Sequence, residues 1–261
     1  MDKYQFEQAI RAVYRQNPCQ VLPNAIWKTI ERLPDLQCSC RAENGAIADL
    51  RAWDSEGLYV FWNKHRTIDE GFRRIAATCQ FIVVHNDHYQ QLEAGEYPVR
   101  DPFFRLLHDL ETIPPPKLPP GFSFREANPE GECIQISELI SRCYRDLHPS
   151  PEIVRSWTRH HAYHPTLWIW IRDDGKGVPA ALGIAEFDHT VGEGSLEWIQ
   201  TLPEYHGQGL GTALVLELLR RLQDRAEFVT VSGEVNNPSN PQRLYRKCGF
   251  AGSDVWWLLR R

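Results

Sequence analysis

The stretch "LPEYHGQGLGTALVLELLRRL", residues 202–222, places three glycines at alternate positions, Gly207, Gly209 and Gly211, directly before an apolar run. The leucine-rich composition of that run predicts a helix over about residues 210–224. Amides in the first turn of a helix lack partners within the helix and lie at the positive end of its dipole. Because glycines let a ligand approach such amides closely, the stretch predicts a phosphate site.

Two common nucleotide motifs do not describe this turn. A Walker loop requires Lys and then Ser or Thr after its last glycine, whereas Thr212 and Ala213 follow Gly211. A dinucleotide fingerprint requires G-x-G-x-x-G, and its last glycine is absent whether the pattern is counted from Gly207 or from Gly209. A strand-to-helix turn that binds no ligand is the remaining alternative.

Composition limits the classes of protein to consider. The 261 residues are 42% hydrophobic and 24% charged, enough for one large or two ordinary folded domains. A net charge of -5 without a run of Lys or Arg argues against nucleic acid or an anionic membrane as partner. Residues 1–16 are amphipathic and charged throughout, so we expect no signal peptide, no membrane span and a cytoplasmic location. The seven cysteines lack metal-like pairing, which indicates reduced thiols and no metal site.

A proline-rich segment predicts the domain boundary. Residues 113–121 read IPPPKLPPG, in which five prolines remove backbone donors and impose extended geometry. We therefore expect an N-terminal domain over residues 1–112, a linker over 113–120 and a C-terminal domain over 121–261.

Hydrophobic periodicity predicts similar orders of elements in the two halves. The first half should contain two helices, over about residues 6–14 and 25–33, then strands at 36–42, 46–53 and 57–62, a helix at 68–78, a strand at 81–84 and a helix at 101–111. The second half should contain a strand at 122–126, helices at 131–145 and 151–159, strands at 166–172, 179–188 and 194–202, the helix at 210–224, a strand at 228–235, a helix at 241–247 and two strands within 250–260. The shared middle order βββαβα suggests an old duplication.

Two motifs in the second half resemble those of one enzyme family. "LEWIQTLPEYHGQGLGTALV", residues 196–215, resembles the acetyl-CoA signature of the GNAT superfamily of N-acetyltransferases, whose loop has Arg or Gln, two residues, Gly, one residue and Gly or Ala. His206, Gly209 and Gly211 occupy those positions. "NPQRLYRKCGF", residues 240–250, resembles the second signature of the family through Leu244, Tyr245, Gly249 and Phe250. The resemblance covers residues 121–261.

The resemblance implies an α/β (α+β) GNAT fold, a mixed, mostly antiparallel twisted sheet flanked by helices, with two GNAT-like domains in tandem. It also implies acetyl-CoA as co-substrate, no metal, and a small-molecule or peptide amine as acceptor. The residues expected to bind the cofactor are Ile199, Thr201, His206, Gly207, Gln208, Gly209, Leu210, Gly211, Thr212 and Asn240. His206 departs from the family's Arg or Gln, and would carry a full charge only below its pKa. Asn240 also fits an N-cap before Pro241, and Asn237 is an alternative for its role.

Acyl transfer from a thioester needs a deprotonated amine, a donor for the developing oxyanion and an acid for the thiolate. Glu197, Ile199 and Thr201 should alternate onto one face of a strand whose end the resemblance assigns to the cofactor arm. Glu197 is the candidate base, acting through water, or else a surface carboxylate. Tyr245, the tyrosine of the second signature, is the candidate acid.

Other polar residues are weaker candidates for a role in the site. Glu186 and Asp188 are alternatives to Glu197 as base. Residues 145–165 are expected to line the acceptor pocket, since the corresponding helices border the acceptor in GNAT enzymes, and the HHAYH run at 160–164 is not expected to hold a metal.

The first half lacks the glycine turn. After its third strand the chain reads NKHRTIDEGF, so we expect a degenerate GNAT-like domain without cofactor. The whole chain is therefore predicted to be an acetyl-CoA-dependent N-acetyltransferase working by direct transfer to a primary amine. The alternative is an inactive acyl-CoA-binding sensor or interaction protein.

Overall fold

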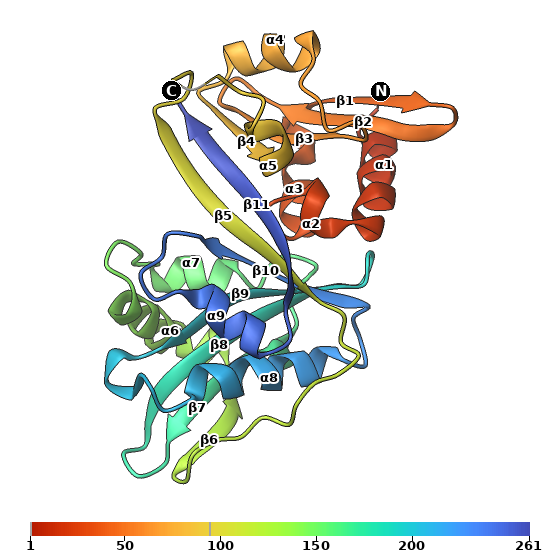
Figure 1. The fold of residues 1–261 in the computed structure, drawn as a ribbon. Helices are drawn as coiled ribbons and strands as arrows, with labels where there is room; N and C mark the ends of the chain where they lie inside the picture. Colours follow the sequence, from red (N-terminus) through yellow and green to blue (C-terminus); the bar gives the residue numbers. More distant parts are fainter. Residues whose placement is uncertain (1, 94) are drawn as a thin grey trace. The chain divides into compact units, whose positions relative to one another are not determined.

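The computed structural model describes residues 2–93 and 95–261. The chain folds into two compact units (Figure 1). Unit 1 comprises Met1–Leu106, Ser232–Asn240 and Gly252–Arg261, and unit 2 comprises Leu107–Val231 and Pro241–Ala251. The C-terminal segment thus belongs to the unit built mainly from the N-terminal half.

Unit 1 is a mixed sheet covered by helices, with strand order β1-β2-β3-β4-β11-β5. The strands are β1 (Gln37–Glu43), β2 (Ala46–Trp53), β3 (Gly57–Asn63), β4 (Phe81–His85), β5 (Val99–His108) and β11 (Ala251–Arg260). The helices are α1 (Lys3–Gln16), α2 (Pro18–Val21), α3 (Ile26–Arg32), α4 (Glu70–Thr78) and α5 (Asn86–Tyr89). Helices α1 to α3 lie on one face of β1 to β3 and α4 lies on the other (Figure 1).

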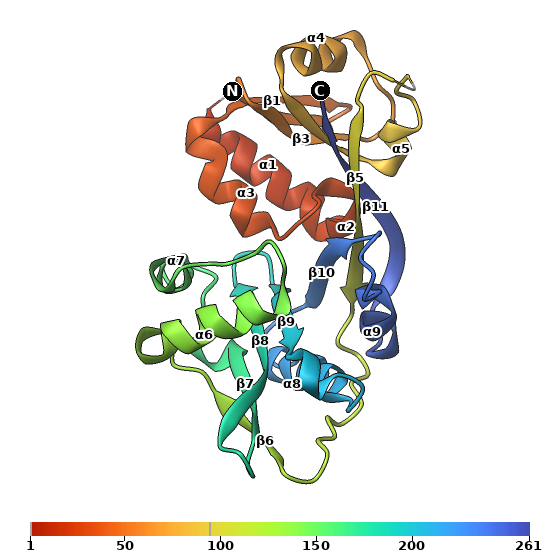
Figure 2. The ribbon, with the colours of Figure 1, turned by 90° about the vertical axis from the view of Figure 1, so that its left-hand side faces the viewer.

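Unit 2 contains the sheet order β10-β9-β8-β7-β6. Its strands are β6 (Phe122–Glu126), β7 (Trp168–Asp173), β8 (Val178–Asp188), β9 (Glu193–Thr201) and β10 (Phe228–Glu234), the last of which continues into unit 1. Its helices are α6 (Pro129–Cys143), α7 (Pro151–Ser156), α8 (Leu210–Leu222) and α9 (Pro241–Lys247). Helix α8 packs on one face and α6 and α7 cover the other (Figure 2). Contact with α8 is so close that a Cβ at Gly183 of β8 would lie 2.8 Å from Leu214.

Each unit repeats the same motif, in which three antiparallel strands are followed by a helix and a parallel strand. In unit 1, β4 pairs with β3 in parallel, as Phe81 with Gly57, and in unit 2 β10 pairs with β9 in parallel. The β1–β2 hairpin turns at Asn44-Gly45, both at positive φ, as the sequence predicted. The repeated order supports the duplication hypothesis.

Two predicted elements are wrong. Residues 101–111 were expected to be helical, yet Val99–His108 form strand β5. Phe104, Arg105 and Leu106 are all buried in the sheet, and a short run buried without alternation fits an inner strand as well as a helix. Residues 250–260 were expected to hold two strands but contain one, β11, which pairs along β4 from Trp256 to Arg260.

The predicted linker, residues 113–120, forms neither helix nor strand, and a domain boundary there stays a prediction.

Candidate functional site

The glycine turn leads directly into α8 in unit 2. Gly207 and Gly209 have φ of 77° and 82°, in the left-handed region where a side chain is strained. No atom lies within 4 Å of a Cβ built at either position, so the turn is open on the side of both glycines. Gly209 immediately precedes Leu210, the first residue of α8, and serves as its N-cap residue.

The amides of this turn have no internal acceptor. In the described chain, none of the N–H groups of residues 207–212 donates a hydrogen bond to another protein group, and Ala213 is the first helical amide to do so, to the Gly209 carbonyl at 3.1 Å. These N–H groups lie at the positive end of α8. Unpartnered amides at a helix N-terminus favour an anion such as phosphate.

His206 is folded back onto the end of β9. Its Nε2 donates to the Thr201 carbonyl oxygen at 2.9 Å, and its backbone N–H donates to the Pro203 carbonyl at 3.1 Å. Only Nδ1 of the ring therefore remains to face another group. That nitrogen is an acceptor when the ring is neutral and a donor when the ring is protonated.

The far part of β9 has a strand on one edge only. Within unit 2, the parallel pairing with β10 extends from Glu193 to Leu196 of β9, which runs on to Thr201. The Leu202 N–H donates to the Ala180 carbonyl of β8 at 3.0 Å. Because peptide groups of a strand alternate between its two edges, the main chains of Ile199 and Thr201 face away from β8. Both groups therefore suit pairing with an extended ligand, although the Thr201 carbonyl already accepts from His206.

Glu197 occupies a β-bulge. In the β8–β9 register Ile184 pairs with Trp198 and Ala185 with Leu196, which leaves Glu197 as the extra residue. The Ser195 hydroxyl donates to Glu197 Oε1 at 2.9 Å. A bulge re-aims side chains and is frequent beside active sites.

The expectation that Glu197 shares a face with Ile199 and Thr201 is wrong, because the extra residue interrupts the alternation. Thr201 lies on the α8 side, where its Oγ1 is 3.9 Å from a Cβ built at Gly211. Glu197 instead lies with Ser195, on the face that carries Trp198.

The second motif lies against the start of α8. Leu244 of α9 is 3.4 Å from a Cβ built at Gly211, and Cys248 Sγ donates to the Thr212 carbonyl at 3.9 Å. Tyr245 is buried and packs edge-on against Phe250 at 5.7 Å between ring centroids. Burial raises the pKa of the Tyr245 phenol, and nearby Tyr144 and Cys248 raise it further. The phenol therefore keeps its proton at neutral pH.

Asn240 is placed in unit 1, at the end of the segment before α9. It has a positive φ of 48°, and its N–H donates to the Asn237 carbonyl at 2.9 Å. The Asn237 side chain accepts hydrogen bonds from the amide and hydroxyl of Ser239, at 3.0 and 2.7 Å. A cofactor-binding role for Asn240 stays a prediction.

Three aromatic residues gather on the face opposite α8. Trp157 stacks on Trp198 with ring centroids 5.1 Å apart, and Tyr144 meets Trp198 edge-on at 5.9 Å. Tyr144 and Trp157 lie within the segment 145–165 or beside it, which the resemblance assigns to the acceptor. No local pattern in the sequence indicates these particular rings, because only the fold brings Tyr144 and Trp157 to Trp198.

The alternative bases are both paired with histidines. Glu186 Oε1 is 3.6 Å from His160 Nε2, and Asp188 Oδ2 is 3.4 Å from His161 Nε2. Burial raises the pKa of Asp188, but hydrogen bonds from Thr190 and His161 outweigh that effect and leave the pKa below its usual value. Glu186 and Asp188 are almost fully buried, whereas Glu197 is only half-buried. Over residues 2–93 and 95–261, no three His, Cys, Asp or Glu side chains cluster as metal ligands would.

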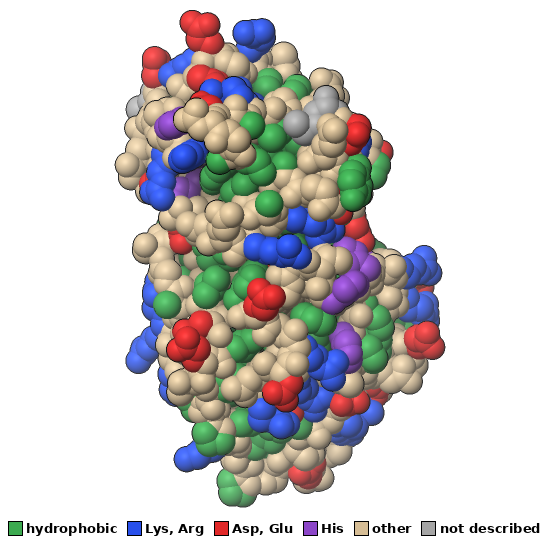
Figure 3. Space-filling model, turned by 90° about the vertical axis from the view of Figure 1, so that its right-hand side faces the viewer, with side chains coloured by type: hydrophobic (Ala, Val, Ile, Leu, Met, Phe, Trp, Pro, Cys, Tyr) green, Lys and Arg blue, Asp and Glu red, His purple; other side chains and the backbone are tan. Residues whose placement is uncertain are grey.

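Acidic and basic side chains are interspersed on the face drawn in Figure 3.

Among the described residues, no helix combines the length and apolar character needed to cross a membrane.

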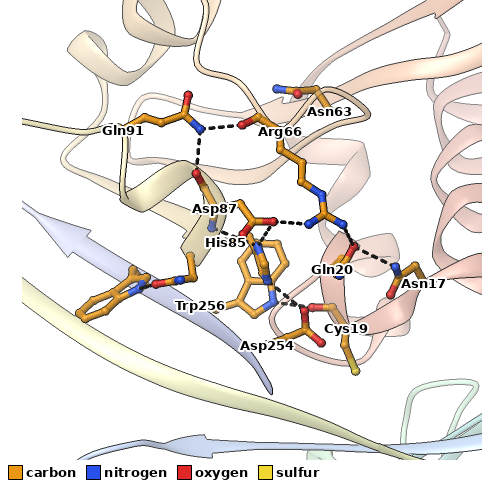
Figure 4. A network of polar contacts seen from close by, with 12 residues as sticks. Asn17, Cys19, Gln20, Asn63, Arg66, His85, Asp87, Gln91, Asp254 and Trp256 are labelled. Carbon is orange, nitrogen blue, oxygen red and sulfur yellow. Dashed lines mark hydrogen bonds and ion pairs between the residues drawn. The ribbon is translucent and has the colours of Figure 1, made fainter. Parts of the chain in front are cut away.

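In unit 1, the loop after β3 is held by hydrogen bonds to other parts of the same unit (Figure 4). After β3, the Thr67 N–H donates to Asn63 Oδ1 at 3.0 Å and the Ile68 N–H donates to Gln91 Oε1 at 3.1 Å. The Arg66 guanidinium donates to Asp87 at 2.9 Å and to Gln20 at 2.8 Å. Amides that are free in unit 2 thus have side-chain partners here, which supports the hypothesis that this half binds no cofactor.

Unit 2 thus combines a helix N-terminus with unpartnered amides, a bulged strand and the tyrosine-bearing helix α9 within the described residues. Residues 133–250 match the family model described as Acetyltransferase (GNAT) family. Residues 133–250 therefore form an acetyltransferase domain of the GNAT family.

Solved structures support the same fold. A GCN5-related N-acetyltransferase from Sphaerobacter thermophilus is similar with a TM-score of 0.64 and 17% identity, over 84% of this chain and 78% of that chain. A GNAT-family acetyltransferase from Colwellia psychrerythraea has a TM-score of 0.67 and 11% identity, over 100% and 97%. A tandem GNAT protein from the clavulanic acid biosynthesis pathway has a TM-score of 0.56 and 14% identity, over 92% and 88%. No curated protein matches the sequence.

Proposed function

We propose that the protein transfers an acetyl group from acetyl-CoA directly to a primary amine. The observation that carries this proposal is the row of unpartnered amides at residues 207–212, placed beside the open edge of β9. The amides suit the pyrophosphate, and the main chains of Ile199 and Thr201 suit the extended pantetheine arm. Acetyl-CoA supplies the activated thioester.

The proposed chemistry needs a base and an acid near the bulge. Glu197 is our candidate to accept the proton of the acceptor ammonium, through water, because it is a half-buried carboxylate on the bulge of β9, where the Ser195 hydroxyl donates to its Oε1. Tyr245 is our candidate to hydrogen-bond the departing thiolate and return a proton to it. Its raised pKa keeps the phenol a donor at neutral pH.

Thioester turnover distinguishes this enzyme from an inactive acyl-CoA-binding sensor. The experiment measures release of CoA from acetyl-CoA with a broad panel of primary amines, against hydrolysis without amine. Amine-dependent release supports the transferase. Binding of acetyl-CoA by calorimetry, with release never above hydrolysis, would establish the sensor instead.

Removing the Tyr245 hydroxyl tests the proposed acid. Tyr245→Phe should lower kcat by about 100-fold, because positioned acids typically contribute that much or more. Affinity for acetyl-CoA should change little, since the ring still packs on Phe250. Steady-state kinetics from pH 6 to 9.5 and calorimetry check both expectations. Undiminished turnover at every pH removes Tyr245 from this role.

Replacing each candidate carboxylate, Glu197, Glu186 or Asp188, by its neutral amide identifies the base. Glu197→Gln should lower kcat/KM for the amine by about 100-fold at neutral pH and reduce the acid-side pH dependence. Glu186→Gln and Asp188→Asn serve as matched controls, which should retain most activity if their role is to pair with His160 and His161. A larger loss in either control than in Glu197→Gln would transfer the role to that residue.

A further inference from the structure

Gln200 is a buried carboxamide without a partner among the described residues. Its side chain is only 5% exposed, and within the described chain neither its Nε2 nor its Oε1 has a hydrogen-bond partner. Its cross-strand neighbour on β8 is Leu182, an apolar residue that suits such a position. Burying an amide whose donor and acceptor are both unused costs stability. A glutamine here is therefore better explained by a ligand than by packing.

Gln200 lies on the face that carries the aromatic group. It follows Trp198 by two residues in β9, so the two side chains share a face, and Trp198 contacts both Tyr144 and Trp157. A second orphaned polar atom lies on the same face. Trp168 Nε1 is fully buried without a partner in the described chain, and the Trp168 ring is 6.4 Å from that of Trp157.

Trp168 and Trp198 both pair with Ile184 of β8, from opposite sides. Cross-strand partners point to the same face of a sheet, so Trp168 belongs to the same group of side chains as Trp198 and Gln200. Among the described residues, two unused donors and one unused acceptor thus occur on the face that carries Trp157, within the segment 145–165 that the resemblance assigns to the acceptor.

We propose that Gln200 recognises an amide group of the acceptor substrate, which would be an amine that also carries a carboxamide or peptide bond. This inference rests on the proposed acetyltransferase function. The Gln200 carboxamide presents a donor beside an acceptor, and an amide is its neutral complement, with an N–H for Oε1 and a carbonyl for Nε2. A free carboxylate is a poorer match, because it has no donor for Oε1 and would be repelled by the Glu197 carboxylate at the bulge. The rings of Trp157 and Trp198 would contact apolar parts of the acceptor.

Four amines test this assignment. They share the isobutyl group and differ only in the other substituent on the carbon that bears the amine. Leucinamide carries a carboxamide, with both an N–H donor and a carbonyl acceptor. Leucine methyl ester offers only acceptors there, leucine has a carboxylate, and 3-methylbutylamine has none of these groups. For the wild-type protein, kcat/KM should be about tenfold or more higher for leucinamide than for the ester, whose carbonyl affects the amine in a similar way, and this is the effect of one or two satisfied hydrogen bonds. Gln200→Met has a similar volume without the amide, and it should remove this preference while leaving kcat/KM for 3-methylbutylamine nearly unchanged.

Two controls separate recognition from a structural role. Gln223→Met removes a glutamine whose amide already donates to the Leu110 carbonyl at 3.2 Å, and it should keep the wild-type preference. The melting temperature of Gln200→Met should equal or exceed that of the wild type, because an unpartnered buried amide is removed. A markedly lower melting temperature would show that Gln200 has an internal partner, and would overturn the proposal.

Calorimetric binding of the same four probes, without acetyl-CoA, keeps the proposal independent of turnover. If no amine is acetylated but leucinamide binds and Gln200→Met loses that binding, the acetyltransferase function fails while the amide assignment stands. If amines are acetylated with no preference for leucinamide, the assignment fails while the function stands. Absence of both turnover and binding with all four probes overturns both.

Discussion

Gly209→Glu is expected to weaken binding of CoA by about 100-fold or more, because placing like charges together at an interface costs several kcal/mol. The glutamate carboxylate would stand among the amides of residues 207–212, where the pyrophosphate is proposed to bind. No protein atom lies within 4 Å of a Cβ at this position, so the free protein can accept the side chain. Isothermal titration with CoA measures the effect.

Backbone strain is the obvious confounding factor, and the chain offers a matched control. Gly177, in the turn between β7 and β8, has a φ of 68° and likewise no atom within 4 Å of a Cβ. Gly177→Glu therefore imposes a similar left-handed strain, of about 1–2 kcal/mol, far from the proposed pyrophosphate. It should bind CoA as the wild type does. Equal affinities of the two variants for CoA would contradict the assignment of the glycine turn.

The elements of the fold could be predicted from the sequence wherever local signals were strong. Asn44-Gly45 fixed a hairpin, and the glycine turn before the leucine-rich run fixed the start of α8, because such signals act within a few residues. The strand β5 was missed because its buried run, Phe104–Leu106, has no strict alternation and is explained only by its neighbours in the sheet. Strand β11 pairs with β4, which lies more than 160 residues earlier in the chain. No local sequence pattern predicts a pairing over that separation.

The candidate site was predicted in part, for the same physical reason. Turn and helix positions such as Gly209 and Tyr245 follow from short motifs. The bulge at Glu197 does not, because it arises from the register between two strands and changes which face the side chain occupies. The unused amide of Gln200 is likewise visible only once burial and every neighbouring donor and acceptor are known.

Acidification between pH 6.5 and 4 is expected to destabilise unit 1 through His88. The His88 ring is 3% exposed and lies 4.5 Å from the Phe61 ring, and neither ring nitrogen has a partner in the described part of the chain. The pKa of His88 is lowered from 6.5 to about 4, mainly by burial; His85 and Arg66 add to the lowering, and Asp87 partly opposes it.

The sign of the effect follows from proton binding. Between pH 6.5 and 4 the unfolded chain binds a proton at His88 that the folded chain does not bind, so the free energy of unfolding falls as pH falls. The stabilisation is fully present above the unfolded pKa, and its loss approaches about 3 kcal/mol when the pH reaches the folded pKa. Urea unfolding of the full chain at several pH values from 7 to 4.5 measures it, with the unit 1 transition followed by amide exchange of residues 81–89.

His88→Leu removes the titrating group and keeps an apolar side chain of suitable size against Phe61, so it should flatten this part of the pH dependence. The same substitution at His148, an exposed residue of unit 2, should leave the wild-type slope unchanged. Because carboxylates also titrate in this range, the informative quantity is the difference in slope between the two variants. An equal fall in the free energy of unfolding for His88→Leu and His148→Leu would mean that the buried ring does not carry the acid sensitivity of unit 1.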